Sequence, residues 1–298
     1  MSDIHNQTSA EHESSKLEAL KLEKLLATEF NPSQLQPQFY MTAELKPGAE
    51  LTMVLEELST PEGASQFLRA FADVLQAPDL QAAVTYFCSW YSGVAVASLY
   101  FLGGEQLRPD FSAANIKVQL FRLENGHSLN FVIGSRIVSR APLDVKEQEE
   151  WVREGLTAFY GETCRKIFEN FAELSGLPIG MIWAQLPGRL DYFVGTWKNS
   201  MENVSTTEKE RGFEERRERL EQAYHILKNL DSDIFGRKKN PFDIRFRYVE
   251  HPTDPSQQMQ MRPSCCLYHM LPRAEYCYNC PKLNEKDRAE RRARVQAQ

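Results

Sequence analysis

The chain has 298 residues, of which 42% are hydrophobic, and its formal net charge at pH 7 is −6. This length and apolar content indicate a soluble globular protein with one large domain or two ordinary ones. The acidic balance excludes a protein whose main task is to neutralise nucleic-acid phosphates, because that task needs clustered positive charge.

The N-terminal residues are polar and acidic, whereas a secretory signal begins with basic residues that an apolar run follows. We therefore expect no export and a cytoplasmic location. In that compartment, closely spaced thiols are metal ligands or redox groups more often than structural disulfides. We expect residues 1–14 to be disordered and a helix to run from near Ser15 to the break at Asn31-Pro32. The connection from there to Pro61 fits helix or strand equally.

Helical periodicity dominates the middle of the chain. It predicts helices over residues 64–75, 80–104, 144–175 and 207–230, with a short helix from Pro178 that ends near Pro187-Gly188. Residues 80–104 carry no charge and are long enough to span a bilayer. Their serine, threonine and glutamine residues, and the lack of a flanking Lys/Arg cluster, favour a buried core helix instead.

The sequence pattern predicts strands in two segments. Two β-branched and aromatic runs flank Asn125-Gly126, a dipeptide that suits the tight turn of an antiparallel hairpin. Alternating apolar and polar residues over 242–249 predict a half-buried strand. The sequence contains neither a P-loop nor a G-x-G-x-x-G phosphate cradle. The expected fold class is α+β, with a mainly helical body, an antiparallel hairpin and a small C-terminal module.

Four of the six cysteines lie near the C-terminus with the spacing C-C-x10-C-x2-C: Cys265, Cys266, Cys277 and Cys280. Neighbouring side chains of a strand point to opposite faces, so two adjacent cysteines can both bind metal only where the backbone bends. A two-iron cluster relaxes this demand because its ligands belong to two metals. Structural zinc prefers two short Cys-x2-4-Cys knuckles around one ion. The spacing favours an iron–sulfur cluster, while zinc and a thiol–disulfide pair remain open.

Other residues near or outside this motif need an interpretation. His269 lies between the two cysteine pairs and could replace a thiolate, although a surface role is the commoner one. Cys88 and Cys164 lie in predicted helices with aromatic neighbours, so we expect buried packing rather than metal binding. For Trp90, Tyr91 and Trp183, core packing is the favoured reading over a ligand pocket.

Residues 262–281, RPSCCLYHMLPRAEYCYNCP, resemble the C-terminal motif of bacterial ferric siderophore reductases of the FhuF kind. In that family the C-C-x10-C-x2-C segment binds a [2Fe–2S] cluster. The resemblance therefore implies that Cys265, Cys266, Cys277 and Cys280 are the cluster ligands. A second, approximate similarity covers GLPIGMIWAQL, where Ala184 and Gln185 stand in place of the usual glycine and asparagine.

The resemblance implies an oxidoreductase that reduces Fe(III) in a siderophore, of hydroxamate type, and releases Fe(II) in the cytoplasm. Its partners would be the ferric siderophore and an electron donor, either a flavin or a redox protein, with no nucleic acid and at most peripheral membrane contact. Tyr268, Tyr276 and Asn279 are candidates to adjust the cluster potential. The alternative is a non-enzymatic interaction or sensor protein that holds zinc or a regulatory cluster.

Four parts of the chain are expected. They are an N-terminal extension (1–35), an α+β body (36–250), a cysteine module for the [2Fe–2S] cluster (251–284) and a polar tail (285–298).

Overall fold

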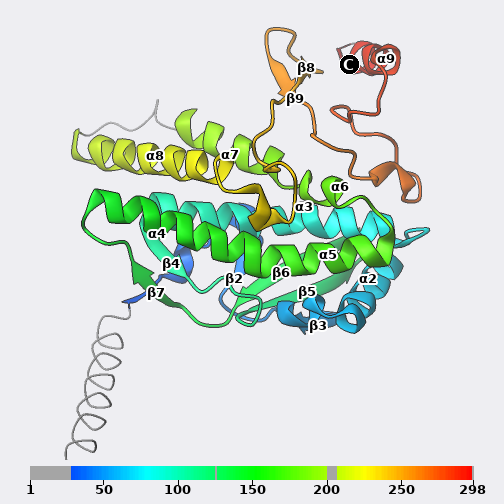
Figure 1. The fold of residues 1–298 in the computed structure, drawn as a ribbon. Coiled ribbons are helices and arrows are strands. Elements are labelled where there is room, and N and C mark those ends of the chain that lie inside the picture. Colours follow the sequence, from blue (N-terminus) through cyan, green and yellow to red (C-terminus); the bar gives the residue numbers. More distant parts are fainter. Residues whose placement is uncertain (1–27, 125, 200–206, 297–298) are drawn as a thin grey trace, which may run out of the picture.

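The computed structural model describes residues 28–124, 126–199 and 207–296. The chain has an α+β fold in which helices dominate and the sheets are small and mostly antiparallel. Figure 1 shows α7 and α8 above the long helices of the body, and the main sheet beneath them. The C-terminal residues lie above α3 and α6, on the side away from the sheet.

Eight helices are described: α2 Pro61–Leu75, α3 Leu80–Leu99, α4 Val145–Thr157, α5 Arg165–Ser175, α6 Ile179–Trp183, α7 Pro187–Asn199, α8 Thr207–Lys228 and α9 Glu285–Gln296. Two π-helical turns adjoin them. Tyr100–Glu105 continues α3, and Ala158–Cys164 joins α4 to α5. Short 3-10 helices cover Pro32–Gln34, Pro37–Phe39, Leu55–Ser59, Ser232–Phe235 and Tyr268–Met270.

The main sheet has the order β2-β6-β5-β3: β2 Met41–Thr42, β6 Gly126–Ile133, β5 Ile116–Leu123 and β3 Leu51–Val54. Its β2 pairs with β6 in parallel, and the other pairs are antiparallel. A three-stranded sheet has the order β1-β7-β4: β1 Thr28–Glu29, β7 Ile137–Arg140 and β4 Leu107–Pro109. The pair β8 Tyr248–Glu250 and β9 Gln258–Gln260 stands apart from both sheets.

Helix α3 forms the centre of the core. It packs against α2, α5, α6 and α7 and against β6. Residues Leu80–Glu105 are long and apolar enough to cross a membrane, but most of them are buried within the fold. The prediction of a buried core helix is confirmed, since a helix that is apolar all round needs protein or lipid on every side.

Local capping explains where the predicted helices begin and end. Thr60 accepts a hydrogen bond from the Gly63 amide at the start of α2. Asp144 accepts from two amides of the first turn of α4, as expected for an N-cap. Gly176 ends α5 with φ 69°, a left-handed conformation that glycine adopts without strain. The helices predicted at 64–75, 80–104, 144–175 and 207–230 are confirmed.

The predicted strand over residues 242–249 is wrong. Only Tyr248–Glu250 is a strand, and it pairs with β9 alone. Phe242 is buried, with its ring 4.9 Å from that of Tyr160, whereas Ile244 is 36% exposed. The apolar residues of this segment therefore do not share one face against a sheet, and among the described strands only β9 pairs with it, at its last two residues.

Three boundaries also differ from the predictions. The helix expected from Ser15 lies mostly outside the described residues, and its described end, Thr28–Glu29, is a strand. In the hairpin, Leu123 pairs with Gly126, so Gly126 begins β6 rather than forming the turn. Pro187 starts α7 instead of ending the preceding helix, because proline fits the first turn, where its missing N–H is not needed.

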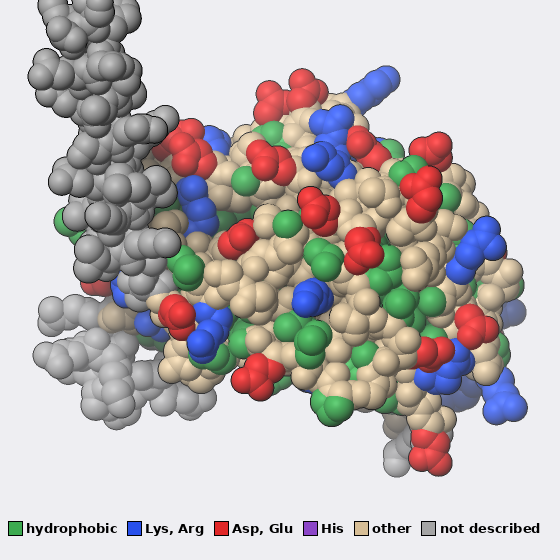
Figure 2. Space-filling model, turned by 90° about the horizontal axis from the view of Figure 1, so that it is seen from below, with side chains coloured by type: hydrophobic (Ala, Val, Ile, Leu, Met, Phe, Trp, Pro, Cys, Tyr) green, Lys and Arg blue, Asp and Glu red, His purple; other side chains and the backbone are tan. Residues whose placement is uncertain are grey.

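The surface below the sheet carries mixed charge. Figure 2 shows acidic and basic side chains interspersed over the described part of this face, with apolar side chains between them. Neighbouring charges of opposite sign reduce the field that a distant ligand would meet.

Candidate metal centre

The four C-terminal cysteines lie together as two pairs of sulfur atoms. The Sγ atoms of Cys265 and Cys280 are 3.8 Å apart, and those of Cys266 and Cys277 are 4.0 Å apart. Each pair combines one cysteine of the adjacent couple with one cysteine of the Cys-x-x-Cys turn. The structure thus brings all four predicted ligands to one place.

The backbone bend that the adjacent cysteines need follows them in the sequence. Leu267 adopts a left-handed conformation with φ 58°, which is rare for a residue with a β-carbon. The amide of Leu267 donates to Cys265 Sγ at 3.4 Å, and the amide of Lys282 donates to Cys280 Sγ at 3.4 Å. Both sulfurs of this pair therefore face backbone donors, which stabilise negative charge on sulfur.

The pairing fits two metals better than one. Two thiolates on one tetrahedral metal, each at about 2.3 Å, lie about 3.8 Å apart. In the described residues, no group of three or more His, Cys, Asp or Glu side chains is placed to share a single ion. A four-cysteine [2Fe–2S] cluster takes two thiolates on each iron, whereas structural zinc needs four ligands around one ion. The arrangement therefore matches the two-iron reading of the spacing.

The second sulfur pair shares a proton. The hydrogen bond with Cys277 lowers the pKa of Cys266 to about 5, and the positive charge of Arg262 acts in the same direction. The same bond raises the pKa of Cys277. Burial raises the pKa of Cys265. This hydrogen bond therefore favours the thiolate form of Cys266, and thiolate is the form that binds metal.

Two side chains of the body hold the cysteine loop from below. Thr85 Oγ1, on α3, donates to the carbonyl oxygen of Cys266 at 2.7 Å, and this hydrogen bond is buried. Gln185 Nε2, between α6 and α7, donates to the carbonyl oxygen of Cys265 at 3.3 Å. Gln185 belongs to the segment whose similarity was only approximate, so that segment contacts the cysteine loop directly. The role of Thr85 has no signal in the sequence.

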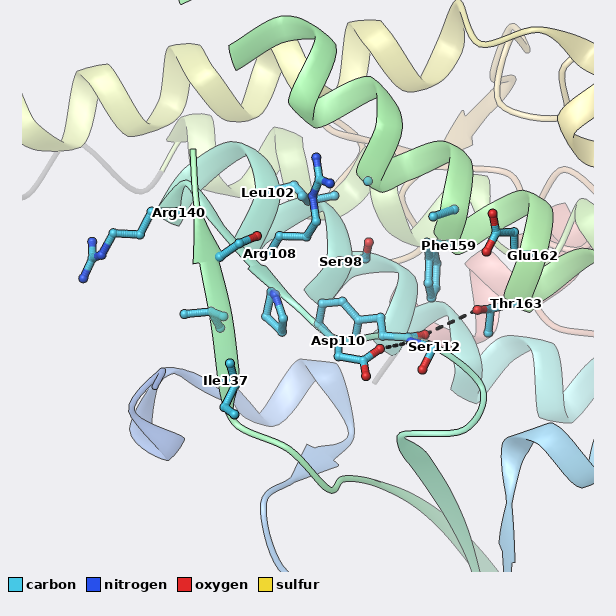
Figure 3. Close-up of a pocket in the computed structure, with 16 residues that line it drawn as sticks. Ser98, Leu102, Arg108, Asp110, Ser112, Ile137, Arg140, Phe159, Glu162 and Thr163 are labelled. Atoms are coloured by element: carbon cyan, nitrogen blue, oxygen red, sulfur yellow. Dashed lines mark hydrogen bonds between the residues drawn. The ribbon is translucent and has the colours of Figure 1, made fainter. Parts of the chain in front are cut away.

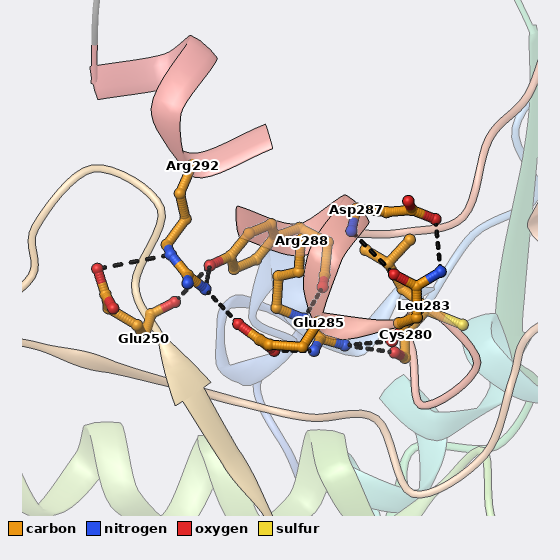
Figure 4. A network of polar contacts seen from close by, with 9 residues as sticks. Glu250, Cys280, Leu283, Glu285, Asp287, Arg288 and Arg292 are labelled. Atoms are coloured by element: carbon orange, nitrogen blue, oxygen red, sulfur yellow. Dashed lines mark hydrogen bonds and ion pairs between the residues drawn. The ribbon is translucent and has the colours of Figure 1, made fainter. Parts of the chain in front are cut away.

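Helix α9 holds the loop from the other side. Arg288 is only 4% exposed and donates to three carbonyl oxygens, those of Tyr278 at 3.1 Å, Cys280 at 3.0 Å and Leu283 at 2.9 Å. Figure 4 shows this guanidinium next to the Cys280 carbonyl, with Glu285 beside it. The basic residue that the sequence placed in a polar tail therefore packs inside the cysteine module.

Its neighbours on α9 also contact the module. Arg292 pairs with Glu250 at 3.6 Å and with Glu285 at 2.9 Å, as Figure 4 shows. Arg291 pairs with Glu275 at 2.8 Å. Most of the arginine charge of this helix is thus used within the module itself.

The candidate tuning residues are placed around the thiols. The ring of His269 stacks on that of Tyr276 at 4.1 Å, and His269 Nδ1 lies 3.8 Å from Cys265 Sγ. Tyr268 stacks on Tyr86, and Asn279 donates to the backbone oxygen of Gln260. In the described structure, no hydrogen bond joins these two side chains or Tyr276 to a cysteine sulfur. Their contacts are those of packing and backbone support.

The residues expected in the core are there. Cys88 and Cys164 are fully buried, away from the four clustered thiols, and Cys164 Sγ lies 3.8 Å from Tyr91 Oη. Tyr91 and Trp183 are buried as well. Trp90 is half-buried and packs on Tyr40, with ring centroids 4.5 Å apart. The prediction of buried packing is confirmed for both helical cysteines.

A cleft of about 750 Å³ opens beside the cysteine loop. Arg262, Pro263, Ser264 and Asn279 line it from the loop, α7 lines the opposite wall, and β8 and β9 close one end. Arg189 is held by Tyr40 and Gln38, and Asp191 accepts from Tyr224 and Gln260. Among the described residues, Arg262 has no carboxylate within ion-pair distance. This volume is typical of a small-molecule site.

Comparison with known proteins bears on the same segment. Residues 262–282 match the family described as the FhuF 2Fe-2S C-terminal domain, and all four paired cysteines lie inside the match. This segment is therefore a [2Fe–2S] domain of the FhuF type, as its motif predicted. The match supports a relation to siderophore-iron reductases and covers only this part of the chain. No curated protein and no solved structure gave a significant match.

Proposed function

We propose that this protein is a cytoplasmic ferric siderophore reductase that transfers one electron to Fe(III) in a hydroxamate-type chelate and so releases Fe(II). The pairing of four thiols inside the matched 2Fe-2S segment carries this proposal. When bound, a [2Fe–2S] cluster supplies electrons one at a time. No acid–base dyad or nucleophile is required for such a reaction.

In this proposal all four cysteines are ligands. Cys265 and Cys280 hold one iron, and Cys266 and Cys277 hold the other, because each couple already has the separation of two thiolates on one metal. Thr85 and Arg288 keep the two halves of the loop at this separation through its carbonyl oxygens. His269 is not needed as a ligand because four sulfurs complete the set.

The cleft beside the loop is the proposed site of the ferric chelate. Arg262 lines the cleft and also stabilises negative charge on the Cys266 sulfur, so a chelate bound in the cleft would be close to the metal centre. The charged residues of the lining are Arg189, Arg262 and Asp191. This lining is close to neutral and suits a chelate of low net charge better than a highly anionic one.

Reduction leads to release because of the ligand preferences of iron. Hard anionic oxygen donors bind Fe(III) much more tightly than Fe(II), so one added electron weakens the complex. Protons from water then occupy the chelator oxygens that the metal leaves. A flavin or a redox protein returns the electron to the reductase, and neither needs to enter the cleft.

A bulky residue in the cleft tests the site. Gly195 of α7 lines the cleft, and a β-carbon there meets no atom within 4 Å. Gly195→Trp should leave the visible spectrum of the cluster unchanged. It should lower the rate of ferrous release from a ferric trihydroxamate by about tenfold or more, through lost chelate binding.

The matched control is Gly212→Trp on α8. A β-carbon at Gly212 also meets no atom within 4 Å, and Gly212 does not line the cleft. This variant should behave as the wild type does. Equal rates of ferrous release for the two variants would show that the chelate does not bind in this cleft. A wild-type protein that holds its cluster and releases no ferrous iron would refute the reductase itself.

A further inference from the structure

A second cavity of about 780 Å³ lies at the other end of α3 from the cysteine loop. Thr85 contacts the loop, whereas Ser98 of the same helix lines the cavity. Thirteen helical steps separate these two residues, which corresponds to about 20 Å along the helix. The cavity is therefore distinct from the metal centre and from the cleft beside it.

The walls of this cavity are mostly apolar. Figure 3 shows β4 and β7 on one side and the end of α3 with the turn Ala158–Cys164 on the other. Most of the lining surface is apolar, and six large apolar side chains contribute to it: Leu102, Pro109, Phe111, Ile137, Val138 and Phe159. Such a lining favours a ligand that is itself largely apolar, because its burial releases water from both surfaces.

Both π-helical turns in the described part of the chain contribute residues to this cavity. Leu102 comes from the turn Tyr100–Glu105, and Phe159 and Thr163 come from the turn Ala158–Cys164. A π-turn inserts an extra residue into a helix and widens it, and such turns occur frequently at functional sites. Here residues of both turns line one space.

Two residues of the lining each carry a buried polar atom that has no hydrogen-bond partner among the described residues. These atoms are Ser98 Oγ, on a side chain that is only 1% exposed, and Arg108 Nε. The rest of the Arg108 guanidinium is engaged, since it donates to the carbonyl oxygen of Trp151 and pairs with Glu154 at 3.5 Å. Figure 3 shows Ser98 between Arg108 and Phe159 at the inner wall. Both unpartnered groups are hydrogen-bond donors, so an acceptor completes them.

The charge of the lining indicates a neutral ligand. Arg108 and Arg140 are balanced by Asp110 and Glu162, and Arg108 also has Glu154 beside it. An added carboxylate or ammonium group would therefore leave one unpaired charge in a mostly apolar space, which is costly. A carbonyl oxygen accepts hydrogen bonds without adding charge.

We propose that this cavity binds a neutral, mostly apolar small molecule whose carbonyl group accepts hydrogen bonds from Ser98 and Arg108. The ligand lies against Phe159 and Leu102, with its carbonyl toward the inner wall. The site acts independently of the cysteine loop, and its ligand needs no redox activity.

Benzophenone is a suitable probe because it is neutral, aromatic and apolar apart from one carbonyl. Under near-ultraviolet light its excited ketone takes a hydrogen atom from a nearby C–H group, and the two carbon radicals join to give a tertiary alcohol on the protein. Peptide mass spectrometry of the full, cluster-loaded chain should find saturable labelling on the peptides that contain Phe159 or Leu102. Diphenylmethane, which has no carbonyl, should compete more weakly by about three- to tenfold, the value of one hydrogen bond.

Two variants make the test specific. Ala158→Trp places bulk at the exposed rim of the cavity and should abolish saturable labelling, whereas Leu143→Trp adds the same side chain at a 98% exposed position outside the lining and should not. Ser98→Ala should weaken labelling by about three- to tenfold.

The proposal is overturned if labelling rises linearly with benzophenone over the whole surface. It is also overturned if Ala158→Trp is labelled like the wild type, or if diphenylmethane competes as well as benzophenone itself.

Discussion

Replacing Arg288 by methionine removes the guanidinium that joins α9 to the cysteine loop, while it keeps an unbranched, flexible side chain at this position. The wild-type group donates to three carbonyl oxygens at 2.9 to 3.1 Å from a position that is 4% exposed. Methionine fills most of the same volume but leaves these carbonyls without a donor. We expect the body to stay folded and the loop around Cys280 to open.

The magnitude follows from the contacts. Each hydrogen bond from a charged donor is worth about 1.5–3 kcal/mol, and the three share one side chain and are not additive. The ion pair with Glu285 adds little because that carboxylate is largely exposed. We take about 4 kcal/mol for the set, since solvent partly replaces the lost donor once α9 moves. Even half of this free energy raises the population of the open loop about thirtyfold.

The assay follows the visible absorbance of the cluster over time, with an iron chelator in excess. Arg288→Met should lose its cluster about thirtyfold faster than the wild type or more, with an unchanged melting temperature of the body by circular dichroism. Arg288→Lys keeps the charge but reaches fewer carbonyls at once, so its rate should fall between the two. Arg294→Met, at an exposed position of the same helix, is the matched control. If both methionine variants keep the cluster equally well, Arg288 does not hold the cysteine loop in place.

Three further results are expected. Cys265→Ser should abolish the visible spectrum of the two-iron cluster, whereas Cys88→Ser should keep it. Iron and sulfide analysis measures the cluster content of each variant. Equal loss in both variants would contradict the ligand assignment. Thr85→Val removes the hydroxyl that donates to the Cys266 carbonyl, so it should speed cluster loss by about three- to tenfold, and an unchanged rate would show that α3 does not hold the loop. Burial lowers the pKa of His127, so protonation favours the unfolded state. The free energy of unfolding should therefore fall as the pH drops below about 6.5. In denaturant titrations at pH 5 and 7, His127→Phe should reduce this difference in the free energy of unfolding. If His127→Phe leaves the pH dependence of the free energy of unfolding unchanged, other groups cause that dependence.

The sequence predicts those features that depend on local chemistry. The helix positions follow from periodicity, and the caps at Asp144 and Gly176 follow from side-chain or backbone chemistry within a few residues. The cysteine spacing favours an iron–sulfur cluster, and the resemblance of the same segment to a known motif implies the [2Fe–2S] type. Both depend on local sequence, because all four thiols lie within 16 residues, from Cys265 to Cys280. The burial of Cys88 and Cys164 follows from their apolar neighbours.

The features that the sequence does not predict depend on distant parts of the chain. The alternation of residues 242–249 looks like a strand, yet a strand needs an edge to pair with, and sequence alone does not show where edges are available. Thr85 reads as a polar interruption of an apolar helix until its contact with Cys266 is seen. Arg288 reads as one charge among many in a basic tail. Both contacts join segments whose meeting depends on the whole fold.

The most direct test mixes the dithionite-reduced protein, freed of excess dithionite and kept under anaerobic conditions, with a ferric trihydroxamate in a stopped-flow instrument. The absorbance of the oxidised cluster and that of a ferrous indicator are followed together. The proposal predicts that both rise with the same rate constant and that one ferrous ion appears for each cluster reoxidised. A cluster that stays reduced, or ferrous iron that appears equally fast with Cys265→Ser, would contradict it.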